Sequence, residues 1–311
     1  APRGMTGIHE LLNRPMLSSD LGEQEHGRWP RAIRDLVRQY REAALPVLNG
    51  SLAYSNLAEG NDQILTCNPY RLWEYSSLFL ELDRGRRCEC FVDIGGAGSA
   101  LSFLLAENGF RGKAADLQPL LVAFCNHVAA VRNLPLQAVV ADVTTDLGEL
   151  AGRCDLVTFI SVLEHVPTAR RPLVMRRMFE LLRPGGLLYL TFDYGTYSEV
   201  DAYRLHEGKV MEESGSIASI GEFAGMALAA GFRFVGNDPL ELPAEVQALR
   251  SAPDHRRITW RYTMNVGAID AATPWGLLAK YLVKRLLRYT ASRSRFERHN
   301  FFRAFLEKPA S

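Results

Sequence analysis

A glycine-rich turn is the segment of this chain best suited to hold a ligand close to the backbone. Residues 92–99 read VDIGGAGS, with a short apolar run before the glycines and a helical pattern after them. Glycines let a ligand approach the main chain, and the start of the following helix supplies free N–H groups. The dinucleotide spacing G-x-G-x-x-G is not met, because Leu101 or Ala97 stands where a glycine is required.

Two carboxylates accompany the next two apolar runs. Asp116 lies near the end of the run 113–117, and Asp142 directly follows the run 136–141. An ionised carboxylate only accepts hydrogen bonds, so its two oxygens suit the two hydroxyls of a ribose. Simpler interpretations stay open, with Asp116 as a surface cap and Asp142 as the N-cap of a following helix.

Alternating strand and helix patterns predict the elements that position these residues. The predicted helices cover 100–108, 119–132 and 169–182, and the predicted strands cover 91–94, 113–117, 136–141, 156–160 and 187–192. This alternation is typical of a parallel sheet with helices on both faces. Ligands of such sheets bind beyond the carboxyl ends of the strands, where the turn and the carboxylates lie.

Three further segments complete a recognisable series. Residues 154–166 read CDLVTFISVLEHV, residues 182–188 read LRPGGLL, and residues 229–236 read AAGFRFVG. Together with the turn, they resemble in order and spacing the motifs of class I S-adenosylmethionine-dependent methyltransferases of the small-molecule type. Asp93 and Gly95 match that family's D-x-G-x-G-x-G turn, while Ala97 and Ser99 replace its second and third glycines.

The resemblance implies a doubly wound α/β fold. It predicts a mostly parallel, seven-stranded sheet of the Rossmann-like methyltransferase type, in a domain spanning residues 88–311. Residues 1–87 are expected to form a helical lid region, and residues 270–298 a helical insertion or extension. Additional strands are expected at 232–235 and 301–306, and residues 257–269 contain a β-rich stretch at 258–263.

The resemblance also implies S-adenosyl-L-methionine as cofactor and S-adenosyl-L-homocysteine as product. In the family, the turn lies against the methionine and ribose, and the acid of the second strand holds the ribose hydroxyls. The acid after the third strand borders the adenine, and the residues after the fourth strand lie near the sulfonium. The cofactor-binding residues expected here are Asp93, Gly95, Gly96, Ala97, Asp116, Leu117, Asp142, Val143, Ser161 and Val162.

A helical segment directly before the first strand is the expected lid helix. Arg71 or Tyr75 of this segment is a candidate for binding the methionine carboxylate of the cofactor. Packing of Trp73 and Tyr75 in an interface between elements is the alternative.

Methyl transfer from a sulfonium is an in-line displacement that depends mainly on positioning. A general base is needed only where the acceptor arrives protonated. The candidate bases are His206 and His165, because histidine titrates near neutral pH. We expect His206 to contact the acceptor and His165 to support the cofactor loop.

Composition narrows the acceptor class. The formal net charge is +1, and Ser161 and Val162 begin the segment where nucleic-acid methyltransferases carry [D/N]-P-P-[Y/F]. Both observations argue against a nucleic-acid acceptor and favour a small molecule. A cofactor-binding partner protein without catalysis, and a lipid-linked or macromolecular acceptor, stay open. No cluster of His, Cys, Asp or Glu has the spacing of metal ligands, so no metal is expected. The absence of a signal-peptide pattern and of a long apolar run predicts a cytoplasmic location.

A basic amphipathic helix is predicted at 275–289. Its apolar positions recur at helical spacing, and Lys280, Lys284 and Arg288 form a row on another face. Three roles are compatible with this pattern: packing on the domain, a homodimer interface, or contact with an anionic membrane surface. The sequence therefore leaves open whether the protein is a monomer or a homodimer.

Overall fold

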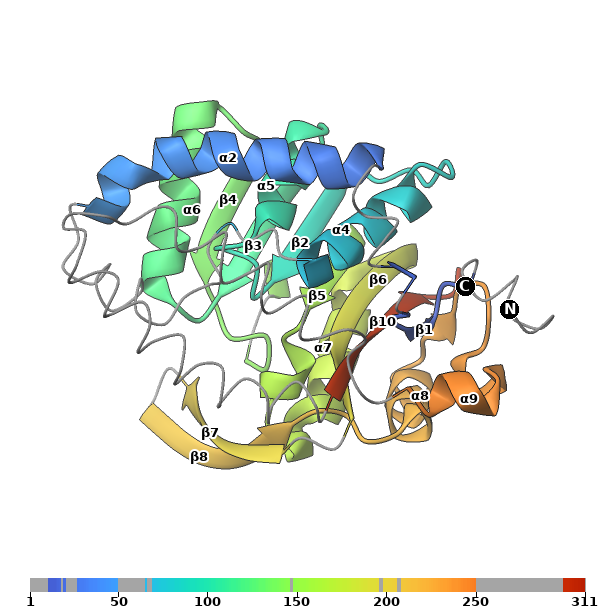
Figure 1. Cartoon of the computed structure of the whole chain (residues 1–311). Helices are drawn as coiled ribbons and strands as arrows, with labels where there is room; N and C mark the ends of the chain where they lie inside the picture. The colour runs from blue at the N-terminus through green and yellow to red at the C-terminus, as the bar shows by residue number, and fades with distance from the viewer. Residues whose placement is uncertain are drawn as a thin grey trace, which may run out of the picture.

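The computed structural model describes residues 11–17, 19–20, 27–49, 65, 69–145, 148–195, 198–205, 208–249 and 299–310. Within these ranges the chain forms an eight-stranded sheet flanked by helices and a separate two-stranded hairpin (Figure 1). The strands of the large sheet lie in the order β1-β10-β6-β5-β2-β3-β4, and β9 pairs with β10.

The centre of the sheet is parallel. Its parallel strands are β2 (Cys90–Ile94), β3 (Arg111–Asp116), β4 (Leu136–Val140), β5 (Cys154–Ile160) and β6 (Leu182–Gly195). The last strand, β10 (His299–Glu307), runs antiparallel to β6. Two short strands, β1 (Arg14–Pro15) and β9 (Arg233–Phe234), pair antiparallel with β10.

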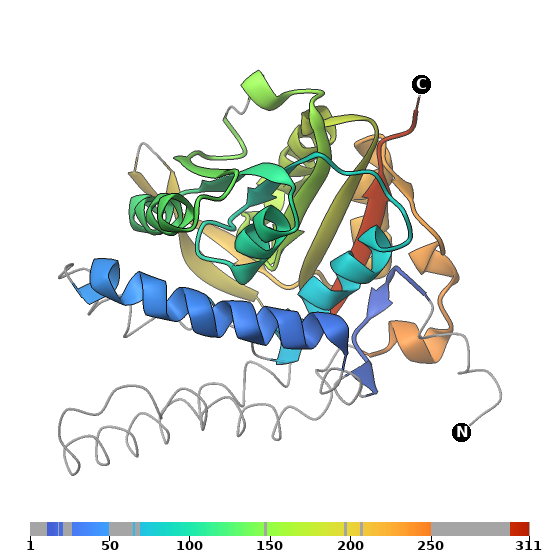
Figure 2. The same cartoon turned by 90° about the horizontal axis from the view of Figure 1, so that it is seen from above.

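Helices cover both faces of the sheet, as the view from above shows (Figure 2). One face carries α2 (Arg28–Asn49), α4 (Pro69–Leu82), α5 (Ala100–Glu107) and α6 (Pro119–Arg132). The other face carries α7 (Arg171–Leu181) and α8 (Ile220–Ala229). The described ranges also contain one short α-helix and four 3₁₀ turns. The helix is α9 (Ala244–Gln247), and the turns are η2 (Gly148–Leu150), η3 (Leu163–His165), η4 (Thr168–Arg170) and η5 (Pro239–Glu241).

Alternation along the strands produces two separate cores. Phe91 and Tyr189 pack toward α4 and α5, whereas Val92 and Phe192 pack toward α7 and α8. Successive side chains of a strand point to opposite faces, so a central strand buried on both faces has to be apolar at nearly every position. Polar residues within these strands are therefore exceptional, and the site is built from them.

The predicted mostly parallel sheet with helices on both faces is confirmed. The helix predicted at 119–132 coincides with α6, and the strand predicted at 301–306 is β10. The sheet has eight strands rather than the seven expected, because β1 from the N-terminal region pairs with β10. The predicted extension at 270–298, the stretch 257–269 and the helix 275–289 lie outside the described residues.

The segment that follows β6 consists of two paired strands. Residues 198–215 form a hairpin of β7 (Ser198–Leu205) and β8 (Gly208–Gly215), in which Leu205 pairs with Gly208. The hairpin stands apart from the large sheet (Figure 1), and β8 packs against η3 and η4. Strand pairing within the hairpin satisfies backbone groups that a loop would leave to solvent.

The N-terminal region predicted as a lid is built into the same core as the domain. Residues of α2 and α4, such as Leu36 and Leu78, share one apolar cluster with Phe91 of β2. The backbone of β1 is held by β10, and the Asn13 side chain accepts a 2.7 Å hydrogen bond from the Phe305 N–H. None of the helices in the described ranges is long and apolar enough to cross a membrane.

Candidate functional site

The carboxyl ends of four adjacent strands bring the predicted site residues to one edge of the sheet. Gly95 follows β2, Asp116 ends β3, Asp142 follows β4 and Ser161 follows β5. Backbone hydrogen bonds tie these ends together, since the Gly95 N–H donates to the Ala115 carbonyl at 2.7 Å and the Ala141 N–H to the Asp116 carbonyl at 3.0 Å. The sheet thus brings motifs that are far apart in the sequence together at one surface.

Asp93, in the last part of β2, accepts hydrogen bonds from three hydroxyl groups around the glycine turn. Its carboxylate accepts hydrogen bonds from the hydroxyls of Ser102 (2.6 Å), Thr158 (2.8 Å) and Ser99 (3.0 Å). Burial raises the pKa of Asp93, and these three hydroxyls oppose the shift. Ser102 and Thr158 are fully buried and Ser99 is half-buried. Asp93 therefore shapes the turn that the resemblance assigned to cofactor binding.

Gly96 leaves room for that carboxylate. A Cβ atom at Gly96 would lie 1.9 Å from Asp93 Oδ2, which no side chain can tolerate. Gly95 has φ +74°, a left-handed conformation that favours glycine, and a Cβ there would lie 2.7 Å from Val162 Cγ2. The turn after β2 and the segment after β5 are therefore in contact.

Two buried carboxylates line the same edge. Asp116 is 7% exposed, and its Oδ1 accepts a 2.9 Å hydrogen bond from the Gln118 N–H. Asp142 is 2% exposed, and its Oδ1 accepts from the N–H and the hydroxyl of Thr144, both at 2.7 Å. Its second oxygen, Oδ2, is buried without a hydrogen-bond partner among the described residues. A buried acceptor without a hydrogen bond lowers the stability of the fold unless a ligand donates to it.

Neighbouring apolar residues complete this part of the surface. Ala97 and Val143 are buried, whereas Leu117 and Val162 are half-buried. Burial raises the pKa of Asp116, and backbone N–H groups of Gln118, Ala97 and Leu117 oppose the shift. The acidic group thus lies between apolar side chains, as a site for a flat ring attached to a sugar requires.

A buried network joins α4 to the ends of β5 and β6. Glu74 is fully buried, and its Oε1 accepts hydrogen bonds from the hydroxyls of Ser161 (2.8 Å) and Thr191 (2.6 Å). Its Oε2 accepts from Arg71 Nη1 at 2.8 Å, and the same nitrogen donates to Ser161 Oγ at 2.9 Å. The Tyr189 hydroxyl donates to the Glu74 carbonyl at 2.6 Å. Glu74 therefore fixes α4 on the sheet.

Sequence reasoning missed Glu74. The sole local signal is its i, i+3 spacing from Arg71, which is common on solvent-exposed helices. Burial alone would lower the pKa of Arg71, but the Glu74 carboxylate outweighs it, so the pKa lies above its ordinary value. The Arg71 side chain is 23% exposed, so it is not completely enclosed by the protein.

Ser161 and Tyr75 connect this network to the glycine turn. Ser161 has φ +50°, an uncommon conformation for a residue with a side chain, and its N–H donates to the Thr191 carbonyl at 3.0 Å. Tyr75 is 2% exposed and hydrogen-bonds with Ser99, and Trp73 is equally enclosed at 3%. The burial of Tyr75 and Trp73 agrees with the alternative that both side chains pack between elements. Cofactor binding by Arg71 and Tyr75 stays a prediction.

The turn η3 presents Glu164 and His165 in different directions. Glu164 is buried at 4% exposure, whereas His165 is exposed. Oε2 of Glu164 has no hydrogen-bond partner within the ranges that the structure describes. Burial raises the pKa of Glu164 well above its usual range, and the charge of Asp193 adds to the shift while Arg71 opposes it. His206, the other predicted base, lies outside the described residues.

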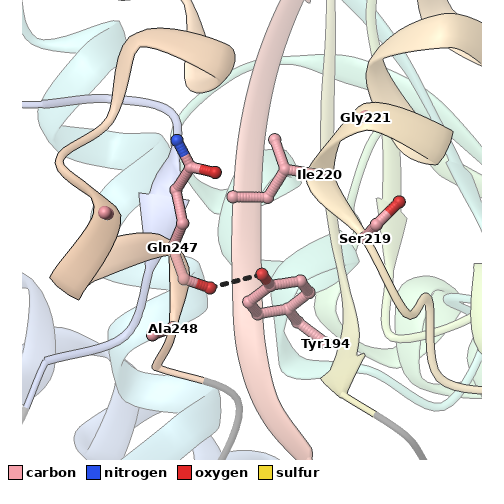
Figure 3. Close-up of a pocket in the computed structure, with 7 residues that line it drawn as sticks. Tyr194, Ser219, Ile220, Gly221, Gln247 and Ala248 are labelled. Atoms are coloured by element: carbon pink, nitrogen blue, oxygen red, sulfur yellow. Dashed lines mark hydrogen bonds between the residues drawn. The ribbon is translucent and has the colours of Figure 1, made fainter.

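A separate open pocket of about 430 Å³ lies beyond the end of β6, on the side of α8 (Figure 3). It is lined by Tyr194, Ser219, Ile220, Gly221, Ala244, Gln247 and Ala248. The Tyr194 hydroxyl donates to the Gln247 carbonyl at 2.5 Å. Because side chains alternate along β6, Tyr194 and Asp193 point to opposite faces, and the strand separates this pocket from the Glu74 network.

Metal-ligating side chains do not converge in the part of the chain that the structure describes. No group of three or more His, Cys, Asp or Glu residues there is placed to hold a metal ion.

Comparison with known proteins identifies a domain within the chain. Residues 91–186 match the model of a methyltransferase domain. The chain carries a class I methyltransferase domain. This domain spans the glycine turn, the two strand-end carboxylates and η3, which are the features assembled above.

Two curated relatives of the methyltransferase domain have the same name. The chain is 36% identical over 124 residues to the "Ubiquinone biosynthesis O-methyltransferase" of Xanthomonas euvesicatoria, covering 40% of this chain and 49% of that protein. The protein of the same name from Xanthomonas oryzae is 34% identical over 124 residues, again covering 49% of its length. The chain thus spans about half the length of the curated relatives it matches.

Solved structures share the fold at low identity. The [4+2]-cyclase SpnF superposes with a TM-score of 0.51 and 16% identity, over 77% of this chain and 83% of that chain. A putative sarcosine dimethylglycine methyltransferase from Galdieria sulphuraria superposes with a TM-score of 0.50 and 14% identity, over 78% and 85%. At this level the likeness concerns the fold alone.

Proposed function

We propose that the protein binds S-adenosyl-L-methionine at the carboxyl ends of β2 to β5 and transfers its methyl group to a hydroxyl of a small molecule. The observation that carries the proposal is the buried Oδ2 of Asp142, which lacks a partner among the described residues. An adenine amino group is a donor suited to such an oxygen. Asp116, one strand away, offers a carboxylate to ribose hydroxyls.

The donor supplies a methyl group already activated by a positive sulfur. The residues of this chain bind and orient the reactants. The turn at 95–97 offers backbone groups, and Arg71, whose side chain is 23% exposed, offers a guanidinium to a carboxylate. The apolar surroundings of Asp116 and Asp142 exclude water from the polar contacts, which strengthens them. Positioning of this kind supplies several kcal/mol in displacement reactions.

Transfer to oxygen is favoured by the names of the curated relatives, which are O-methyltransferases. A second candidate function is cofactor binding without methyl transfer. It is favoured by the likeness to SpnF, a cyclase with the same fold. A lipid-linked or macromolecular acceptor is a third candidate, because residues 275–289 carry a basic amphipathic pattern.

Calorimetry with S-adenosyl-L-methionine and S-adenosyl-L-homocysteine tests donor binding. We expect Asp142→Asn to weaken binding about tenfold, because an amide NH₂ would face the adenine amino group. Asp116→Ala should weaken it by about 1–3 kcal/mol through loss of charged hydrogen bonds to the ribose. Asp35→Asn, an exposed acid on α2, is the matched control. Unchanged affinity of both site variants would refute the site.

Labelled S-adenosyl-L-methionine then separates the candidate functions. Methyl incorporation into a hydroxylated small molecule supports the proposal, and binding without transfer to any acceptor favours the cofactor-binding partner. His165→Ala and His206→Ala test the two histidines predicted as bases. If both variants keep full turnover, neither histidine acts as the base.

We propose a cytoplasmic location for the protein. We also propose that residues 275–289 pack against the methyltransferase domain. A chain lacking residues 275–298 would be compared with the full chain for unfolding free energy, oligomeric mass and binding to anionic vesicles. Lower stability at unchanged mass supports packing. A lower mass supports a homodimer instead, and loss of vesicle binding supports a membrane contact.

A further inference from the structure

Glu164 is a buried carboxyl group that the network around Glu74 does not use. It lies in η3, directly beyond the carboxyl end of β5, at 4% exposure. Its Oε2 is buried and has no hydrogen-bond partner among the described residues. The neighbouring His165 is exposed, so the buried group offered by this turn is the carboxyl of Glu164.

Charged groups face Glu164 from several elements. Asp193 at the end of β6 and Glu74 of α4 act on it as like charges, and Arg71 of α4 acts as the opposite charge. Arg71 is already ion-paired with Glu74 at 2.8 Å. Arg171 of α7 donates to the Glu164 carbonyl at 3.4 Å and to the Gly215 carbonyl at 2.5 Å.

One further strand packs on η3. This is β8, whose sequence includes Lys209, Glu212 and Glu213. Among the described side chains, Asp193 and Glu74 act on Glu164 as like charges, whereas Arg71 is shared with Glu74 and Arg171 is bound to two backbone carbonyls. A site with this balance favours protons and cationic ligands.

We propose that Glu164 is the catalytic residue that takes the proton of the acceptor hydroxyl during methyl transfer. The inference rests on the proposed function. The acceptor O–H bond breaks and its proton moves to Oε2 of Glu164, while the acceptor oxygen bonds to the methyl carbon. The bond from that carbon to sulfur breaks, and its electron pair stays on sulfur. Glu164 is then a neutral acid, and it returns the proton to solvent when the products leave.

The surroundings of Glu164 raise the proton affinity of its carboxylate, as a general base requires. Burial and the charge of Asp193 raise the pKa of Glu164 well above that of an ordinary glutamate, which makes the carboxylate a stronger proton acceptor. Positive charge arriving at this end of the sheet lowers that pKa again, because it favours the carboxylate. Binding of a cationic donor should therefore release a proton from Glu164 and leave the base ready.

Calorimetry without any acceptor tests this coupling. S-adenosyl-L-methionine is titrated into the full chain in two buffers of different ionisation enthalpy, which reports the protons released per donor bound. We expect release with S-adenosyl-L-methionine and less with the uncharged sulfur of S-adenosyl-L-homocysteine. In Glu164→Gln we expect the release to disappear while the donor dissociation constant changes less than about threefold.

Turnover provides the second measurement. We expect Glu164→Gln to lower kcat by about 10²- to 10⁴-fold, the usual contribution of a general base. Glu164→Asp should keep part of the rate with a shifted pH profile. Glu180→Gln, which changes an exposed acid on α7, is the control and should keep both the proton release and the rate. Thermal unfolding checks the fold, and Gln is isosteric with the buried Glu164.

Each outcome has one meaning. Wild-type proton release and rate in Glu164→Gln refute the assignment, as does an equal loss of both in Glu180→Gln. A Glu164→Gln protein that fails to fold, together with a wild-type rate and profile in Glu164→Asp, also refutes it. Failure of the wild-type chain to bind S-adenosyl-L-methionine refutes the proposed function itself, and the role of Glu164 with it.

Discussion

Replacing Glu74 by glutamine tests whether the buried network holds α4 on the sheet. The Glu74 carboxylate accepts from Ser161 and Thr191 on one oxygen and from Arg71 on the other. Glutamine keeps a carbonyl oxygen for the two hydroxyls. Its NH₂ group then faces the Arg71 guanidinium, so two donors meet where a charged hydrogen bond existed.

The size of the effect follows from the burial of the two partners. Removing one member of a buried ion pair typically costs about 3–5 kcal/mol, and a hydrogen bond to a charged group contributes roughly 1.5–3 kcal/mol. Glu74 is fully buried, but the Arg71 side chain is 23% exposed, so water can partly solvate the stranded guanidinium. We therefore expect Glu74→Gln to lower the free energy of unfolding by about 2–3 kcal/mol.

Urea denaturation followed by circular dichroism measures this loss as a lower midpoint at an unchanged slope. The control is Asp35→Asn, which removes another i, i+3 ion pair, with Arg38, whose side chains are 57% and 71% exposed. Exposed pairs contribute roughly 0–1 kcal/mol, so the control should stay close to the wild type. If Glu74→Gln lost no more stability than Asp35→Asn, the network would not hold the helix.

Two other perturbations have definite expected outcomes. Gly96→Ala places a Cβ atom 1.9 Å from Asp93 Oδ2, so the carboxylate must leave its hydroxyl partners, and we expect a loss of at least about 2 kcal/mol in urea denaturation. Gly225→Ala, in α8 with nothing within 4 Å of the new Cβ, is its control and should gain about 0.5–1 kcal/mol. Equal behaviour of the two glycine variants would contradict this account of the turn. Burial raises the pKa of Asp20, but two hydrogen bonds from Arg14, both 2.7 Å, outweigh it and hold the pKa below its usual value. This carboxylate therefore stabilises the fold above about pH 4, and its contribution is lost as the pH falls through the lower folded pKa. Asp20→Asn should flatten the dependence of stability on pH in that acidic window, and an unaltered dependence would show that other carboxylates dominate it.

Much of the fold was predictable because its signals are local. An apolar run, a turn residue and a helical pattern identify β2, the glycine turn and α5 within a few neighbouring residues. Parallel strands place their carboxyl ends at one edge, so Asp116 and Asp142 could be assigned to a common surface from their positions after two strands. The inward orientation of Asp93 was not predictable, since its partner Thr158 is 65 residues away.

The tertiary structure decided the rest of the site. Glu74 meets Ser161 and Thr191 across 87 and 117 residues, and no pattern near Glu74 distinguishes it from an exposed helical acid. The pairing of β1 with β10, which adds an eighth strand, likewise joins the two ends of the chain. Glu164 and His165 are adjacent in sequence, and only the packing of η3 against β6 and β8 turns the acid inward and the histidine outward. The spacing of apolar residues predicts which face of a helix or strand is buried. A three-residue turn has no such repeat, so the elements packed against it decide which of its side chains is buried.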